Sequence, residues 1–553
     1  MPNPYPALAR ELTTPKSQDA NPAIQLFGRR FFSDQTIPEL LIELLLVATA
    51  PKKIADFEVA SGNCFPGIDT LKNWPENAPL AYAPKSRLNL KLFSLLGASK
   101  LETRHHTHID HYKELIKGIG DSIELSGGIN RRDVLKTMEN LFLGLQRVGG
   151  QRTWCAQSFL PICQQLISGE TLWKSTMGDQ ANDWSDLIEQ GRFTHFFSSN
   201  QHRFLARGGE ALYLQICNAL RTSQNEMNDW LKSLDCRQNE GDEVEAERLR
   251  TALSLSLNQA LQSCPEGLGR LASFIDQGVD RDTQRGTDTD KAAGGARYAE
   301  CGWCPEETWK EGYLFAVDLL RICQAKLDPV ERLTLMETAC AMQVLRTICA
   351  QSSRYDEGTG NTGAGPLGYV WAISDPDGRD PILKRISQRS VTTTLFMIQR
   401  ALRCTEIKEN VAKQQGSAGS QWTDPYKEAD TRYGHKLFQT LSKRLGFMVP
   451  RRGPGARFVL TDHLLRYLVL TIVRPGERMT YDSFLDQIFL RVGIALSGKH
   501  LNRACEWSSS YPPAAIGEDT GQWLTDMLEG AGVLVRLSDS CSMVENPLGN
   551  GRA

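Results

Sequence analysis

Residues 104–111, RHHTHIDH, are the strongest candidate for catalytic chemistry in this chain. Three of the histidines and the aspartate follow the spacing H-x-H-x-D-H. Imidazole and carboxylate groups are good zinc ligands, and a zinc-bound hydroxide is a strong nucleophile at neutral pH. The spacing therefore supports the hypothesis of a metal-dependent hydrolase or nuclease with zinc as its cofactor. The ligands in that hypothesis are His106, His108, Asp110 and His111.

This spacing resembles the metal-binding signature of the metallo-β-lactamase family, whose hydrolases hold one or two zinc ions and activate a bridging water. In that family the motif follows a buried apolar strand, and further ligands come from later in the chain. Here residues 99–103, SKLET, make a poor buried strand. Ile109, Tyr112 and Ile116 have helical spacing instead, which predicts one amphipathic helix through the motif. We therefore expect an exposed histidine-rich helix, with the metal site as the alternative.

Cys301 and Cys304 form a C-x-x-C pair just before an expected helix. The pair resembles the motif of thioredoxin-like oxidoreductases and one half of a zinc knuckle. A helix N-terminus stabilises a thiolate, which favours reactivity. A thioredoxin fold needs a strand before the pair, however, and a structural zinc needs two more ligands, whereas the sequence has no second C-x-x-C. We expect a structural role for these thiols and keep redox or zinc chemistry as alternatives.

The composition is that of an ordinary globular protein, with 41% hydrophobic and 23% charged residues. The 63 Lys and Arg residues are balanced by 65 Asp and Glu residues, so any nucleic-acid contact must come from a local patch. The longest apolar run, residues 37–50, is too short to span a bilayer, and residues 1–18 lack the apolar core of a secretory signal. We therefore predict a cytoplasmic protein without membrane contact, whose 14 cysteines are mostly free thiols.

Apolar residues recur at helical spacing along most of the chain. The predicted fold class is mainly α, a multi-domain helical body with a C-terminal α+β module. Residues 277–300 have almost no large apolar side chain, and residues 413–430 begin with a Gly- and Gln-rich stretch, so both are predicted linkers. The predicted domains are a helical N-terminal domain (1–276), a helical middle domain (301–412) and a C-terminal domain (431–553).

The C-terminal domain has an ordered pattern of helices and strands. Two helices are expected to begin after the N-caps Thr461 and Thr480, and residues 523–544 predict a third helix followed by a β-hairpin. From about residue 433 to 548 this order resembles a winged-helix domain, in which a Leu-Glu-x-x-Gly step joins the third helix to the hairpin. Residues 497–513 have no place in a minimal winged helix and are expected to be an insertion.

Winged helices bind DNA in some proteins and dock other proteins elsewhere. A DNA-reading helix needs nearby cations, but residues 519–530 contain Asp519, Asp526 and Glu529 and no Lys or Arg. The positive charge lies in the approach to the module instead. We predict that any nucleic-acid contact involves Lys443, Arg444, Arg451, Arg452 and Arg457.

The sequence contains no G-x-S-x-G, H-E-x-x-H or kinase signature, which favours a non-enzymatic protein. A large helical chain of this kind resembles accessory subunits of multi-gene bacterial antiviral systems, and that resemblance implies a role in antiviral defence. The leading hypothesis is an adaptor or accessory subunit without a cofactor, which binds other protein subunits. It contacts double-stranded DNA through the C-terminal module and its basic flank. The alternative is the metal-dependent hydrolase or nuclease.

Overall fold

The structure is a computed structural model, and helices make up most of the chain that it describes, with strands in small mixed sheets. The prediction of a mainly α fold is confirmed. Among the described helices, none is both long and apolar enough to cross a membrane. The residues from His106 to His111 lie outside the described part. The described residues are 2–7, 21–29, 31–33, 35–59, 63–83, a few positions between 128 and 198, 208–234, 245–262, 298–358, 364–418, 424–509, 521–538 and 541–549.

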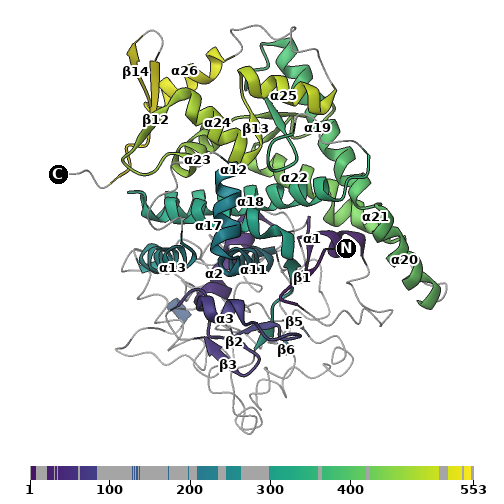
Figure 1. The fold of residues 1–553 in the computed structure, drawn as a ribbon. Coiled ribbons are helices and arrows are strands. Elements are labelled where there is room, and N and C mark those ends of the chain that lie inside the picture. The colour runs from purple at the N-terminus through teal and green to yellow at the C-terminus, as the bar shows by residue number, and fades with distance from the viewer. Residues whose placement is uncertain are drawn as a thin grey trace.

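Four helices form the middle of the molecule. Helix α11 packs against α2 and α17, and α18 packs against α17 and α2 (Figure 1). Helix α11 approaches α17 closely because Gly312 has no side chain: a Cβ there would lie 2.1 Å from the carbonyl oxygen of Gln215. Helix α2 begins with a capping box, in which the Thr36 amide donates to the Glu39 carboxylate at 2.6 Å. The four helices are α2 (Ile37–Thr49), α11 (Gly208–Arg221), α17 (Trp309–Gln324) and α18 (Pro329–Arg354).

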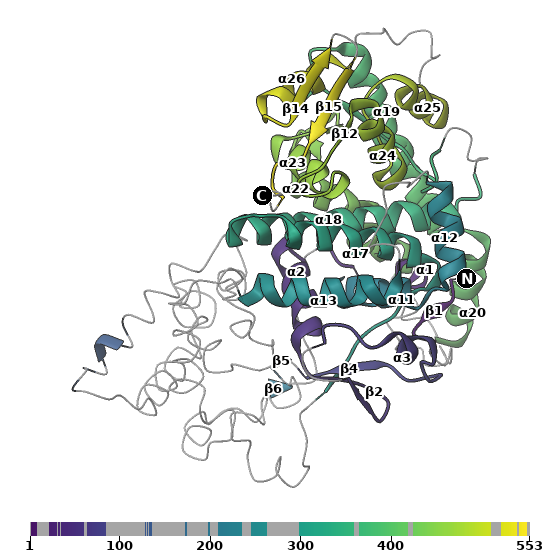
Figure 2. The ribbon, with the colours of Figure 1, turned by 60° about the vertical axis from the view of Figure 1, so that its left-hand side comes forward.

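Short strands and helices surround this middle layer. An antiparallel sheet of order β3-β2-β4-β7 lies at one end, and a two-stranded ribbon joins β1 to β8 (Figure 2). In both, residues near position 300 pair with residues near the start of the chain. The strands are β1 (Pro4–Tyr5), β2 (Lys52–Ile54), β3 (Phe57–Val59), β4 (Leu80–Tyr82), β5 (Leu172–Trp173), β6 (Phe197–Ser198), β7 (Ala299–Glu300) and β8 (Cys304–Pro305). The helices are α1 (Pro22–Phe27), α3 (Ile68–Lys72), α12 (Gln224–Ser233), α13 (Ala246–Gln262) and the 3₁₀ helix η7 (Glu306–Thr308).

Above α18, a second sheet has the order β10-β11-β9-β13 (Figure 1). Strands β11 and β13 run parallel to the central strand β9, and α19 packs on β9 and β11. Strand β9 is buried at every position, as expected for a parallel strand covered on both faces. The elements are β9 (Trp371–Ser374), α19 (Pro381–Ala401), α20 (Thr405–Ala418), α21 (Pro425–Glu428), the π-helix η8 (Ala429–Tyr433), α22 (His435–Leu445), β10 (Met448–Val449), β11 (Arg457–Val459) and β13 (Ile494–Ala495).

The last elements include a three-stranded antiparallel sheet of order β12-β15-β14, which packs against helices α24 and α26. The predicted caps are confirmed: the Thr461 and Thr480 hydroxyls each accept a hydrogen bond from the backbone amide three residues on, at 3.3 Å. Helix α25 occupies part of the expected insertion, residues 497–513. The elements are α23 (Asp462–Ile472), β12 (Arg478–Thr480), α24 (Tyr481–Val492), α25 (Gly498–Ser508), α26 (Gln522–Gly530), β14 (Leu534–Ser538) and β15 (Cys541–Glu545).

One cluster of buried apolar side chains extends from Tyr5 to Val544, so residues of all three predicted domains pack in it. Much of the predicted linker 413–430 is helical, because α20 continues to Ala418 and α21 and η8 begin again after residue 424. Of the predicted linker 277–300, only residues 298–300 are described, and β7 lies there.

A buried group of charges joins α17, α18 and α24. The Asp318 carboxylate accepts hydrogen bonds from the Arg346 guanidinium at 3.0 Å and the Tyr467 hydroxyl at 3.1 Å. The Arg491 guanidinium lies 3.5 Å from the same carboxylate. The side chains of Asp318, Arg346 and Arg491 are at most 4% exposed. Burial lowers the pKa of Arg346, but the Asp318 carboxylate together with Tyr467 and Tyr369 raises it by more, so the guanidinium remains charged.

Candidate functional site

A basic groove of about 990 Å³ lies where α22, α18, the start of α2, the start of α23 and the β10–β11 turn meet. Four of the five predicted nucleic-acid contacts line this groove. Two of them precede β10 in the sequence and two follow it, so the fold brings both segments to one cavity. Lys436, which the sequence analysis did not select, is a fifth cation in its wall. The cations of the groove are Lys436, Lys443, Arg444, Arg451 and Arg452.

Helix α22 provides three of these cations because it is amphipathic. Its apolar positions, including Phe438 and Leu441, are buried, and Lys436, Lys443 and Arg444 lie on another face at spacings of seven and eight residues. Cations in the last turn are favourable beside the negative end of the helix dipole. The helix ends at Gly446, whose left-handed φ of 78° suits glycine at that position.

The tip of the β10–β11 hairpin provides Arg451 and Arg452. Both side chains are exposed, and both line the groove. The turn contains Gly453 and Gly455 with φ values of 93° and 80°, a backbone conformation that disfavours other residues. The glycines thus allow a tight turn that carries the two arginines at its tip.

The fifth predicted contact, Arg457, lies elsewhere. Its side chain is buried, and its guanidinium donates to the Ser374 hydroxyl at 2.6 Å and to the carbonyl oxygens of Asp375 and Pro376 at 2.8 and 2.9 Å. These bonds tie the start of β11 to the turn after β9. Arg457 therefore supports the hairpin that carries Arg451 and does not line the groove.

The groove cations differ in how they are held. The Arg444 guanidinium donates to the carbonyl oxygens of Gln35 and Ser33 at 3.0 and 3.3 Å, which fixes the end of α22 to the loop before α2. Within the described part of the chain, the other four cations form no ion pair. Their charge is therefore available to an anion. The N-terminal turn of α2, which also lines the groove, adds the positive end of a helix dipole.

Glu337, Thr338 and His463 line the opposite wall of the groove. The Thr338 hydroxyl donates to the Thr334 carbonyl oxygen at 3.0 Å and lies 2.6 Å from Nε2 of His463, so Nε2 is assigned as the protonated nitrogen. Burial lowers the pKa of His463, and the nearby Glu331 carboxylate opposes this, so the ring is mainly neutral at pH 7. Burial also raises the pKa of Glu337 to about 7.

Glu337→Gln is expected to remove a pH dependence of stability. The Glu337 pKa rises from 4.5 to about 7 on folding, so the folded state binds more protons between these values. The free energy of unfolding should therefore fall as pH rises from 4.5 to 7 and then level off. At pH 8 the variant should be more stable than the wild type by about 3 kcal/mol. Urea titrations between pH 5 and 8 test this, with the exposed Glu409→Gln as control. An unchanged pH profile in Glu337→Gln would contradict it.

Cys301 and Cys304 are both buried. Cys304 lies in β8, which pairs with β1, so a strand and not a helix N-terminus holds it. Burial raises the pKa of Cys304 to about 12, and the Thr308 hydroxyl and the Arg221 guanidinium lower it by less. A thiol with this pKa is protonated at neutral pH and is a poor nucleophile. In the part of the chain that the structure describes, no three His, Cys, Asp or Glu residues are grouped as metal ligands.

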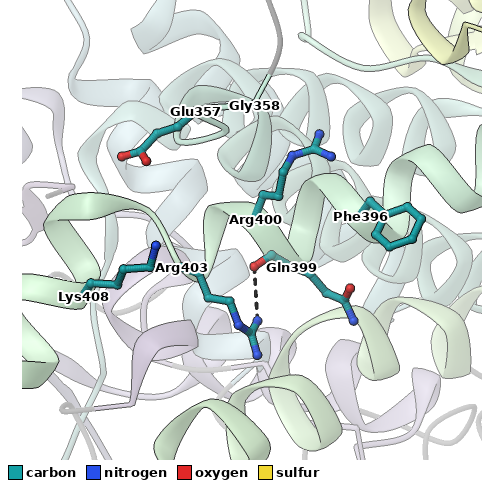
Figure 3. Close-up of a pocket in the computed structure, with 7 residues that line it drawn as sticks. All are labelled: Glu357, Gly358, Phe396, Gln399, Arg400, Arg403 and Lys408. Atoms are coloured by element: carbon teal, nitrogen blue, oxygen red, sulfur yellow. Dashed lines mark hydrogen bonds between the residues drawn. The ribbon is translucent and has the colours of Figure 1, made fainter.

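An aromatic pocket of about 610 Å³ lies between the end of α19 and the start of α20 (Figure 3). The Arg400 guanidinium binds the Asp356 carboxylate through two bonds of 2.7 Å, and Arg403 binds Asp430 in the same two-pronged manner. Glu357 caps α20 by accepting from the Thr405 amide at 2.7 Å. The pocket residues are Glu357, Gly358, Phe396, Gln399, Arg400, Arg403 and Lys408.

Known proteins give no comparison for either cavity. No protein family, no curated protein and no solved structure matches this chain. The two cavities are therefore interpreted from their own chemistry.

Proposed function

We propose that this protein is a non-enzymatic adaptor or accessory subunit that binds nucleic acid through the basic groove. One observation carries the proposal: five cations from α22 and the β10–β11 turn line one cavity, and four of them form no ion pair among the described residues. Phosphates of a nucleic-acid backbone are the natural counter-charges for such a set, and their binding releases condensed counterions. Because the chain as a whole carries a formal charge of −2, this local patch is what attracts a polyanion.

We further propose that residues 433–548 form a winged-helix-like module with α25 as an insertion. The order of helix α23, strand β12, helices α24 and α26 and hairpin β14–β15 supports this, as does the strand order β12-β15-β14. Helix α26 carries Asp526 and Glu529, and Glu529 forms an ion pair with Arg536 of β14. This acidic helix is better suited to docking a protein subunit than to reading DNA. A role in antiviral defence and the metal-dependent hydrolase stay predictions.

Arg451→Ala/Arg452→Ala is expected to weaken the binding of a fluorescent duplex and of its single strand. Each phosphate contact contributes about 0.9 to the slope of log Kd against log salt for duplex DNA, so the double variant should lower that slope by about 2. Fluorescence anisotropy at several salt concentrations measures both quantities. Because the two side chains are exposed, the variant should fold normally.

The matched control is Arg248→Ala/Arg379→Ala, which removes two exposed arginines outside the groove. It should leave affinity and salt slope unchanged. Equal weakening by both variants would indicate binding by charge in general and not by the groove. A wild-type protein that binds neither duplex nor single strand would overturn the proposed function.

A further inference from the structure

We propose that the basic groove and the aromatic pocket form one continuous track for single-stranded nucleic acid, with Phe396 as a platform on which an unpaired base stacks. This inference rests on the proposed function and specifies its ligand. The groove supplies cations for the backbone, and the pocket supplies a ring for a base. These are the two components of single-strand binding sites that recognise no particular sequence.

The two cavities approach each other at the start of α22. Gln399 lines the aromatic pocket, and its side-chain amide lies 3.4 Å from Nδ1 of His435. The next residue, Lys436, lines the basic groove. One hydrogen-bonded pair of side chains thus separates the pocket wall from the first cation of the groove. From Lys436 the groove follows α22 to Arg444, eight residues or about 12 Å along the helix axis.

Phe396 lies on the helix face that borders the pocket. Phe396, Gln399 and Arg400 follow the spacing i, i+3 and i+4 on α19, so they share one side of that helix, and Arg403 lies just after its end. The Phe396 side chain is 54% exposed, and Figure 3 shows its ring beside Arg400 at one end of the pocket. An exposed phenylalanine ring offers a flat apolar face, and every base has a complementary π face.

The charges around this ring are held in position. The Asp356 and Asp430 carboxylates fix the guanidinium groups of Arg400 and Arg403, and Lys408 adds a third cation at the other end of the pocket (Figure 3). Positioned guanidinium groups can contact a phosphate or stack on a base.

The placement of Phe396 favours a single strand over a duplex. In a duplex each base face is covered by its neighbours, and exposing one costs a few kcal/mol. A single strand presents its base faces without that cost. Phosphates and base faces are common to DNA and RNA, so both kinds of single strand are expected to bind.

Phe396→Ala tests the track. Probes are single-stranded DNA and RNA of about 16 nucleotides, within the known range of single-strand site sizes, and the matching DNA duplex. The variant should weaken single-strand binding by roughly tenfold or more, because one stacked base is lost, and should leave the salt slope unchanged. Duplex binding should not change. Phe396→Trp should retain single-strand binding, whereas Phe396→Leu, apolar but without a ring, should lose it.

Phe57→Ala is the matched control, since this ring on β3 is 66% exposed but lies outside both cavities. It should bind all probes as the wild type does. If Phe396→Ala binds single strands with wild-type affinity while Arg451→Ala/Arg452→Ala weakens binding, the track is wrong and the proposed function stands. Displacement of the single strand by poly-glutamate at equal charge concentration would point to an acidic protein ligand and would also overturn the track.

Discussion

Replacing Asp318 by alanine is expected to lower the free energy of unfolding by about 3–5 kcal/mol, because the change leaves buried arginine charge without its counter-ion. Asp318 accepts from Arg346 and Tyr467, and Arg491 lies 3.5 Å from it. All three charged side chains are almost inaccessible to water. Chemical denaturation followed by far-UV circular dichroism measures the loss.

Two further variants distinguish charge from packing at this position. Asp318→Asn retains an acceptor of the same shape but removes the charge. It should therefore lower the free energy of unfolding by less than Asp318→Ala does. A double-mutant cycle of Asp318→Ala with Arg346→Met should show coupling, because the second change removes one of the unpaired charges. Asp377→Ala, at an exposed ion pair with Arg379, is the control and should change stability by about 0.5 kcal/mol or less. A loss below 1 kcal/mol in Asp318→Ala would show that this group is not the buried charge pairing described above.

Trp371→Ala is expected to lower the free energy of unfolding by about 3–5 kcal/mol, because it removes the largest side chain from the centre of the upper sheet. Trp371 is fully buried in β9. Its ring centroid lies 4.6 Å from that of Tyr369, 5.2 Å from Phe447, 6.1 Å from Phe438 and 6.2 Å from Phe458. Denaturant titrations of wild type and variant test the loss.

The same substitution should also weaken nucleic-acid binding, although Trp371 does not line the groove. Phe438 belongs to α22, which carries three groove cations, and Phe447 precedes β10, so both depend on Trp371 for packing. Phe396→Ala removes an exposed ring and should change stability by about 0.5 kcal/mol or less, which makes it the control for ring loss. A Trp371→Ala protein as stable as the wild type would show that the aromatic cluster repacks around the cavity.

The helices could largely be predicted from local sequence. Capping at Thr461 and Thr480 was predicted because an N-cap depends on residues within one turn of it. Arg451 and Arg452 were selected as candidate contacts because they belong to a basic stretch before the C-terminal helices. These features depend only on residues that are close together in the sequence, so one sequence is enough to predict them.

Burial and the joining of distant segments were decided by the tertiary structure. Arg457 belongs to the same basic stretch as Arg452, yet the packing of β11 on β9 turns its guanidinium to the carbonyl oxygens of Asp375 and Pro376. For Cys304 the sequence indicated a structural role but kept redox or zinc chemistry as alternatives, and the pairing with β1 places the thiol in the core.

The candidate site shows the same division. By itself the sequence determined a mainly helical protein with a local cluster of cations between residues 443 and 452, because helix periodicity and charge clustering are properties of neighbouring residues. Only the tertiary structure decided that these cations share a groove with Glu337 and with the start of α2. The start of α2 precedes the cations by about four hundred residues in the sequence. Such contacts depend on how buried faces pack across the whole fold, and no local pattern encodes them.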